Sequence, residues 1–169
     1  MKRIRQTEVH EFIRHQLKGK LRGDLLNHRI LREGDIECCT YSHLRRFLSA
    51  DSDWRVFAHK HDKNTGYYPD LVICHREHGL AFHIEIKWNR RKISNRDRKK
   101  LGTYLNNGAR KGYFVTAGPD VGNFSKPVKE RRERWRLFVI KAGLKFDGGR
   151  KSRAFARWTE ERRLFKKLS

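Results

Sequence analysis

The amino-acid sequence predicts a single α/β domain organised around a mixed sheet. A helical pattern of apolar residues over 33–50 is followed by three strand-like runs between residues 54 and 88, and then by a helix and a strand over 94–117. At 169 residues the chain is long enough for one domain with a hydrophobic core and short for two. We therefore expect one domain over 1–169, with a core over about 33–117 and a basic, helical C-terminal extension over about 126–169.

The charge of the chain indicates the kind of partner. Its net charge is +22, from 41 Lys and Arg against 19 Asp and Glu. Residues 126–169 contain 16 of these cations and 5 of the acids, so about half of the net charge lies in the last quarter of the chain. Solubility requires far less charge, and such a domain repels itself unless its partner is a polyanion. We expect that partner to be nucleic acid.

Several other classes of protein are disfavoured. The three cysteines, Cys38, Cys39 and Cys74, show no CxxC or Cys/His spacing, which argues against a structural zinc site. The basic start MKRIRQ is not followed by an apolar run, and no stretch has the length of a membrane span. These features predict a soluble, cytoplasmic protein with three free, buried thiols and no membrane association.

Two helices are expected before the first strand. Residues 8–18 place Val9, Phe12, Ile13 and Leu17 at helical spacing, and Gly19 and Gly23 are expected to break that pattern. Leu25, Leu26, Ile30 and Leu31 form either a second short helix or a linker. A stronger helix is expected from about Glu33 to Ala50, with an apolar stripe of Ile36, Thr40, Leu44, Phe47 and Leu48.

Glu33 and Glu37 fall on or beside this apolar stripe. A carboxylate that faces a core is costly unless it is paired, protonated or bound to a metal. Acids in the first turn of a helix also interact favourably with the positive end of the helix dipole. Either explanation fits each residue on sequence grounds.

The most informative stretch is the predicted hairpin over residues 67–88. Leu71–Cys74 and Leu80–Phe82 flank a polar turn that contains Gly79. Side chains alternate along a strand, so Glu85 and Lys87 should share one face while Ile84 and Ile86 share the other. If Asp70 lies beside them on the neighbouring strand, two carboxylates and an ammonium occupy one pocket, which is typical of a metal-dependent phosphodiesterase. His59 and His61 have no evident third metal ligand, so we expect them to be exposed.

The second half of the chain adds a crossover helix and further basic segments. Ser94 and Asp97 form a capping-box pattern, and Asn106-Asn107-Gly108 is typical of a helix end. Gly112–Ala117 is expected to be a strand parallel to the third one, reached by a right-handed crossover. From Pro127 we expect a helix, broken at Gly148-Gly149 and followed by a second amphipathic segment. The apolar residues of the two segments are Val128, Trp135, Phe138 and Val139, and Phe155, Trp158, Leu164 and Phe165.

The order helix, three strands, helix, strand, with Pro69-Asp70 on the second strand and Glu85-Ile86-Lys87 on the third, resembles the PD-(D/E)xK nuclease superfamily. The resemblance covers residues 33–117, about half of the chain. It implies the restriction-endonuclease-like α-β-β-β-α-β core with a mixed sheet flanked by helices. It also implies a Mg²⁺-dependent endodeoxyribonuclease, of the junction-resolving, homing, repair or phage type.

The resemblance also implies roles for individual residues. Asp70 and Glu85, with the backbone carbonyl of Ile86, would bind Mg²⁺, and Mn²⁺ should substitute. Lys87 would orient or deprotonate the attacking water, or stabilise the pentacovalent state. A helix glutamate often completes such a site; Glu33 is the first candidate and Glu37 the second. His83 should lie on the Glu85 face, at the substrate or at the pocket mouth. The basic helix after the third strand would line the approach to the phosphodiester backbone with Arg90, Arg91, Lys92, Arg96, Lys99 and Lys100.

Two other functions fit the sequence. The chain could bind DNA or RNA without catalysis while keeping the nuclease fold, although a complete Asp, Glu and Lys trio argues against this. It could instead be a basic structural protein of a ribonucleoprotein, in which the C-terminal segment is the functional part. A nuclease that cuts two opposed strands would need two sites, so a homodimer is a further expectation.

Overall fold

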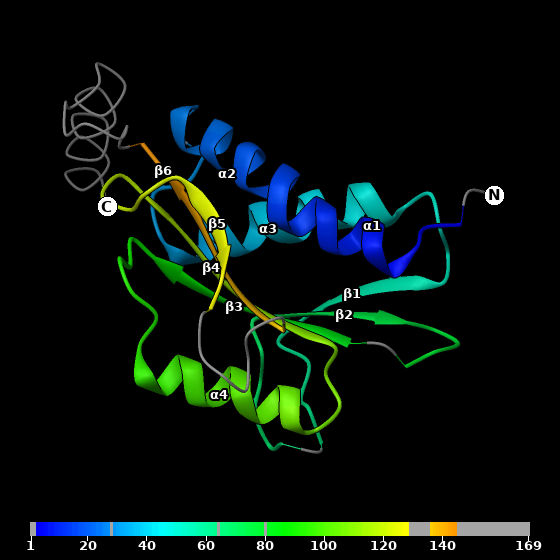
Figure 1. Cartoon of the computed structure of the whole chain (residues 1–169). Helices are drawn as coiled ribbons and strands as arrows, with labels where there is room; N and C mark the ends of the chain where they lie inside the picture. The colour runs from blue at the N-terminus through cyan, green and yellow to red at the C-terminus, as the bar shows by residue number, and fades with distance from the viewer. Residues whose placement is uncertain (1–2, 28, 64, 80, 129–135, 145–169) are drawn as a thin grey trace.

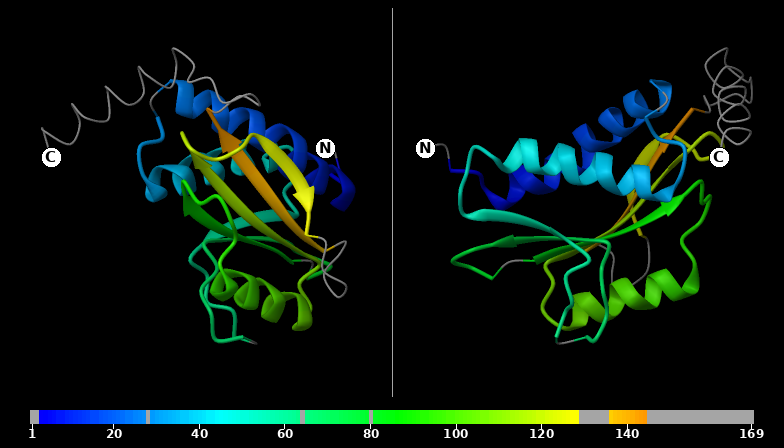
Figure 2. Two further views of the ribbon diagram at one scale, coloured as in Figure 1. Left: turned by 60° about the vertical axis from the view of Figure 1, so that its left-hand side comes forward. Right: turned by 180° about the vertical axis from the view of Figure 1, so that it is seen from behind.

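A computed structural model describes residues 3–27, 29–63, 65–79, 81–128 and 136–144. It confirms an α/β fold: a six-stranded mixed sheet in the order β1-β2-β3-β4-β6-β5, with helices on both faces (Figure 1). Helices α1 (Gln6–Glu11), α2 (Leu17–Leu26) and α3 (Glu33–Leu48) cover one face, and α4 (Asn95–Asn106) covers the other (Figure 2). The strands are β1 Trp54–Ala58, β2 Leu71–His75, β3 Ala81–Trp88, β4 Lys111–Gly118, β5 Phe124–Pro127 and β6 Leu137–Gly143.

The N-terminal helical region is longer than the sequence predicts. Three helical segments follow one another without a gap: α1 Gln6–Glu11, the π-helical turn η1 Phe12–Gln16 and α2 Leu17–Leu26. The expectation that Gly19 and Gly23 break this helix is therefore wrong. A glycine inside a helix costs only about 1 kcal/mol relative to alanine, and burial of one apolar face offsets that cost. The buried residues of α2 on that face include Leu17, Leu21 and Leu25.

The central elements agree with the sequence prediction. Helix α3 spans Glu33–Leu48, and β1, β2 and β3 pair antiparallel in succession. Helix α4 spans Asn95–Asn106, and its N-cap Ser94 accepts a hydrogen bond from the backbone N–H of Asp97 at 3.1 Å. Strand β4 then lies parallel to β3. The predicted α-β-β-β-α-β order is thus confirmed up to residue 118.

The expectation of a helix starting at Pro127 is wrong. Pro127 ends β5, and Phe138 and Val139 belong to β6, which lies between β4 and β5 and runs parallel to β4. All seven residues of β6 are buried, as in a strand covered on both faces. The sheet therefore continues beyond residue 117. Trp135, Gly148-Gly149 and the predicted amphipathic segment that follows lie outside the described residues.

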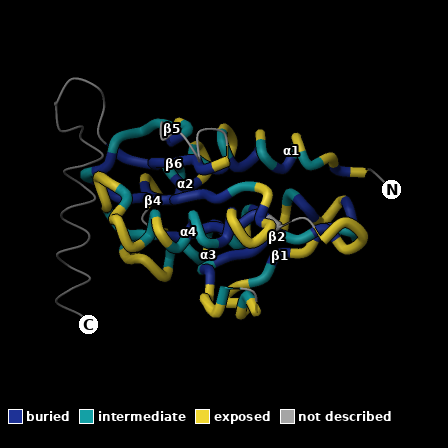
Figure 3. Tube along the Cα trace, turned by 60° about the horizontal axis from the view of Figure 1, so that its bottom comes forward, coloured by how far each residue is buried: buried dark blue, intermediate teal, exposed yellow. Residues whose placement is uncertain are grey.

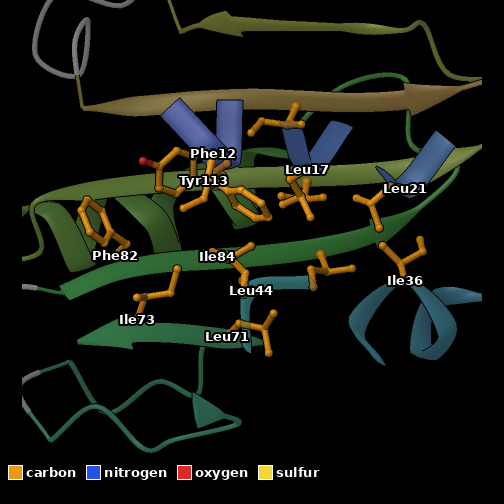
Figure 4. Close-up of a cluster of buried hydrophobic side chains, with 14 of the residues drawn as sticks. Phe12, Leu17, Leu21, Ile36, Leu44, Leu71, Ile73, Phe82, Ile84 and Tyr113 are labelled. Atoms are coloured by element: carbon orange, nitrogen blue, oxygen red, sulfur yellow. The ribbon is translucent and has the colours of Figure 1, made fainter. Parts of the chain in front are cut away.

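Two hydrophobic clusters hold the layers together. The larger one joins the N-terminal helices and α3 to one face of the sheet, through side chains such as Phe12, Leu44, Ile84 and Tyr113 (Figure 4). The smaller one joins α4 to the other face, through Leu101, Tyr104, Phe114 and Val139 among others. The buried stretches follow the inner strands, while exposed residues gather on the outer sides of the helices and in loops (Figure 3). This packing fixes the positions of β3 and α4, which carry most of the site described below.

The cysteines and the helices bear on two further expectations. All three cysteines are free, but Cys38 is exposed and Cys39 and Cys74 are only half-buried, so the expectation of three buried thiols is wrong. Within the described part of the chain, no helix has the length and apolar character needed to cross a membrane.

Candidate active site

Asp70, Glu85 and Lys87, the central residues of the predicted site, lie close together at two neighbouring strands. Strands β2 and β3 pair with Leu71 opposite Ile84, which brings Asp70, just before β2, next to the middle of β3. The Asp70 carboxylate accepts a hydrogen bond from the backbone N–H of Ile86. Ile84 and Ile86 are buried in the larger cluster, whereas Glu85 and Lys87 line a cavity beside α4. The predicted alternation along β3 is therefore confirmed.

Glu85 is the most buried member of the group, at 1% exposed. Burial, and after it the negative charge of Asp70, raise the pKa of its carboxyl to about 7. The ammonium of Lys100, from α4, opposes this shift: its Nζ lies 2.7 Å from Oε1 and 2.9 Å from Oε2 of Glu85. Lys100 was predicted to contact the nucleic-acid backbone. Its ammonium instead reaches into the site and pairs with a carboxylate.

Lys87 is held by oxygen atoms from two elements. Its Nζ donates to Glu33 Oε1 at 3.1 Å and to the carbonyl of Ile86 at 2.7 Å, and lies 3.9 Å from Asp70 Oδ2. Burial alone would lower the pKa of Lys87, but the charges of Asp70 and Glu33 outweigh it and raise that pKa above its usual value. The Lys87 side chain is therefore positively charged, and its ammonium group is held in a defined position.

The two helix glutamates have different partners. The second carboxylate oxygen of Glu33 accepts a hydrogen bond from the backbone N–H of Trp88 at 3.0 Å, so Glu33 ties the start of α3 to the end of β3. Glu37, one turn further along, pairs with the exposed His59 at 2.7 Å. Burial raises the pKa of Glu37, and the negative charges of Asp70 and Glu33 add to that effect. Glu33 is thus the glutamate that contacts Lys87.

His83 lies on the Glu85 face of β3, as expected, but it does not line the same cavity. It is buried, stacks on the ring of Tyr104 at 4.3 Å between centroids, and lies 3.6 Å from the Asp62 carboxylate. Burial lowers its pKa to about 4. Its position fits that of a packing residue beneath a second, smaller cavity that it lines with Asp62 and Cys74.

Asp70, Glu85 and Lys87 line a cavity of about 680 Å³. Five of the six predicted nucleic-acid contacts also line it, namely Arg90, Lys92, Arg96, Lys99 and Lys100. The sixth, Arg91, lines a separate groove with Phe124 and Lys141, and its carbonyl accepts a hydrogen bond from Lys141. The structure therefore gathers the carboxylates and most of the predicted cations, and leaves Arg91 out.

Sequence reasoning missed the aromatic side of this cavity. Tyr67 and Tyr68, from the loop between β1 and β2, line it together with the basic residues of the 89–100 segment. Both tyrosines are exposed. The available signal was two adjacent aromatic residues in a polar loop, directly before Pro69-Asp70.

The donor atoms at the site suit a hard divalent cation. Asp70, Glu85 and the Ile86 carbonyl offer only oxygen ligands, which Mg²⁺ and Mn²⁺ prefer. Glu85 Oε1 is buried and accepts no hydrogen bond of good geometry, although the Lys100 ammonium lies close to it. Such an atom fits a cation ligand. Within the described residues, no three His, Cys, Asp or Glu side chains cluster as a metal site, so the backbone carbonyl would have to serve as the third protein ligand.

Comparisons with known proteins add little to this geometry. No protein-family model matches the sequence, and no curated protein matches it. Among solved structures, the fold is similar to a chain in the assembly of Thermococcus gammatolerans McrB AAA+ hexamers with bound McrC, at 13% identity and a TM-score of 0.37. The match covers 77% of this chain and 33% of the other, so this chain spans about a third of that chain's length. A likeness this distant carries no functional argument.

Proposed function

We propose that this protein is a metal-dependent phosphodiesterase of the PD-(D/E)xK type. The observation that carries the proposal is the convergence of Asp70, Glu85 and Lys87 on one cavity, with Glu33 bound to Lys87. These residues come from a loop, a strand and a helix that lie far apart in the sequence. Two carboxylates next to a fixed ammonium are what phosphodiester hydrolysis requires: a place for a cation and a positive charge for the reacting phosphate.

Within that class, we propose that the protein is an endodeoxyribonuclease. The cations around the cavity and the net charge of +22 both favour a polyanionic substrate. A cavity that opens beside exposed residues, rather than a closed tunnel around a chain end, suits attack within a strand. Cleavage of both strands would call for a second copy of the chain.

Each residue would contribute differently to hydrolysis. Asp70, Glu85 and the Ile86 carbonyl would hold a divalent cation, whose charge would neutralise the phosphate and favour loss of a proton from the attacking water. Lys87 is directed by Glu33 and would stabilise the negative charge that develops on the phosphate oxygens. Lys100 would have to leave Glu85 when the cation binds, and its ammonium would then be free for the substrate phosphate.

Cleavage of supercoiled plasmid and of branched oligonucleotides tests this proposal. We expect nicking in Mg²⁺ and in Mn²⁺ and none in a chelator, because the carboxylates cannot promote hydrolysis without the cation. Lys87→Ala should lose activity while it still binds DNA. Wild-type protein that cuts nothing in either metal, or Lys87→Ala with full activity, would overturn the proposal.

A second candidate is a nucleic-acid-binding protein that keeps the fold without catalysis. One observation favours it: two ammonium groups already contact the expected metal ligands, Lys100 at Glu85 and Lys87 at the Ile86 carbonyl. Calorimetry with Mn²⁺ separates the candidates. The nuclease should bind Mn²⁺ in a manner that Asp70→Asn abolishes, whereas the non-catalytic protein should bind none at this site.

A further inference from the structure

An aromatic surface borders the candidate active site and is unusual for this protein. Tyr67 is 41% exposed and Tyr68 is 58% exposed, and among the described residues the only other exposed large hydrophobic side chain is Leu26. Leu26 ends α2, which covers the face of the sheet opposite α4, whereas both tyrosines line the cavity that contains Asp70 and Glu85. Solvent-exposed rings gathered at a single cavity suggest a binding role.

The loop that carries these rings is anchored at both ends. The backbone N–H of Asp62 donates to the carbonyl of Tyr67 at 2.9 Å, and that of His59 donates to the carbonyl of Asp70 at 3.1 Å. The ring of Tyr67 also packs edge-on against Tyr104 of α4, with 6.2 Å between centroids. The tyrosines therefore have a defined position relative to the Asp70 carboxylate.

One side chain links this aromatic surface directly to the site. The ammonium of Lys100 donates to the backbone carbonyl of Tyr68 at 2.8 Å and pairs with the Glu85 carboxylate at 2.7 Å. Tyr68 is thus held through its backbone, while its side chain stays exposed. That ring lies near His61, with 4.8 Å between centroids.

The cavity therefore presents two kinds of wall to a nucleic acid. Arg96 and Lys99 supply positive charge for phosphates, and the tyrosines supply flat apolar surface. In a duplex the faces of each base are covered by its neighbours, and the outside offers only sugar, phosphate and base edges. Exposed rings are useful to a strand whose bases have free faces, on which they can stack.

We propose that Tyr67 and Tyr68 stack on unpaired bases next to the phosphate at the site, so that the preferred substrate is a single strand or the unpaired segment of a branched DNA. This inference rests on the proposed function only for the nature of the polymer. What the two tyrosines distinguish is whether the bases of the substrate are paired or unpaired. Duplex lacking unpaired bases would be held by the cations alone.

Binding in a chelator, measured by the fluorescence anisotropy of labelled oligonucleotides with the full-length protein, tests the proposal. Three probes are compared: a single-stranded DNA, a blunt duplex, and a single strand of abasic nucleotides that keeps every phosphate. Since stacking is worth about 1–3 kcal/mol per base, Tyr68→Ala should weaken single-strand binding by about 5- to 150-fold. The same substitution should change binding of the duplex and of the abasic strand by less than about twofold, since the duplex has free base faces only at its two ends and the abasic strand has none.

Two further variants control for general damage. Tyr68→Phe keeps the ring and should bind single strands like the wild type, whereas Leu26→Ala removes an exposed side chain remote from the cavity and should change nothing. The proposal is overturned if Tyr68→Ala and Tyr67→Ala both leave single-strand affinity unchanged, or if they weaken the abasic strand as much as the natural one. Because no cleavage occurs in a chelator, absence of nuclease activity in Mg²⁺ would not alter this outcome.

Discussion

Glu33 and Glu37 lie one helical turn apart on α3, yet their partners differ. Glu33 binds Lys87 and the backbone of Trp88, and Glu37 binds His59. We therefore predict that Glu33→Gln lowers the cleavage rate by about 10- to 100-fold, as is common when a group that orients a site residue is removed. Glu37→Gln, the matched control, should stay within about threefold of wild type. Equal losses in single-turnover cleavage by the two variants would contradict the assignment.

Lys100 compensates the buried charge of Glu85, which leads to a prediction about stability. Lys100→Met leaves the carboxylate without its ammonium partner, and we expect a loss of about 2 kcal/mol in the free energy of unfolding in a chelator. A divalent cation should restore much of this stability, because it would take the place of the ammonium.

Urea unfolding with and without Mn²⁺ measures this effect. Lys99→Met is the control, since Lys99 is exposed and lines the same cavity. A Lys100→Met variant as stable as the control in chelator, with no response to Mn²⁺, would show that the pair does not compensate Glu85.

The sequence alone could locate some of these residues and not others. The face shared by Glu85 and Lys87 follows from strand alternation, which is a local rule. The pairing of Lys100 with Glu85 joins two elements, and it depends on how α4 packs on β3. The same limit applies to Arg91, which points into another groove although its neighbours in sequence line the cavity.

At the scale of elements, the predictions that were confirmed are those marked by local sequence signals such as helix caps and turn glycines. Ser94 and Asp97 mark the start of α4, and Gly79, with a positive φ of 56°, lies in the turn between β2 and β3. Strand β6 was mistaken for a helix because Val128, Phe138 and Val139 were assigned to one helical stripe. The seven consecutive buried residues of Leu137–Gly143 instead form a strand enclosed by β4 and β5.

The position of β6 gives a test at this scale. A Cβ added at Gly143 would meet the backbone carbonyl of Val121 at 1.9 Å, which only a backbone shift could relieve. We therefore predict that Gly143→Ala lowers the free energy of unfolding by about 2 kcal/mol or more.

The matched control is another glycine-to-alanine change. Gly19 lies within α2 and has no atom within 4 Å of an added Cβ, so Gly19→Ala should raise stability by about 0.5–1 kcal/mol. Urea unfolding of both variants measures whether each substitution lowers or raises the free energy of unfolding. A neutral Gly143→Ala would mean that β6 does not pass close to Val121.

At the scale of the whole molecule, charge should dominate affinity for DNA. The net charge is +22, and several cations surround the cavity. If 6–10 phosphates are neutralised, affinity should fall by about 10³- to 10⁵-fold between 50 and 200 mM salt. Replacing both Arg96 and Lys99 by alanine should reduce the slope of log affinity against log salt by about 2. Affinity that does not change with salt, measured by anisotropy, would contradict this picture.

We propose that Asp70, Glu85 and Lys87 act together, with a bound divalent cation, in the hydrolysis of DNA. The single-turnover rate of plasmid cleavage in Mg²⁺, compared between wild type and Asp70→Asn at equal DNA occupancy, tests it most directly. We predict that wild type cleaves and that Asp70→Asn is slower by at least about a hundredfold, because the amide removes a charged ligand without changing the size of the side chain. Equal rates for the two proteins, or no cleavage by wild type in Mg²⁺ and in Mn²⁺, would contradict it.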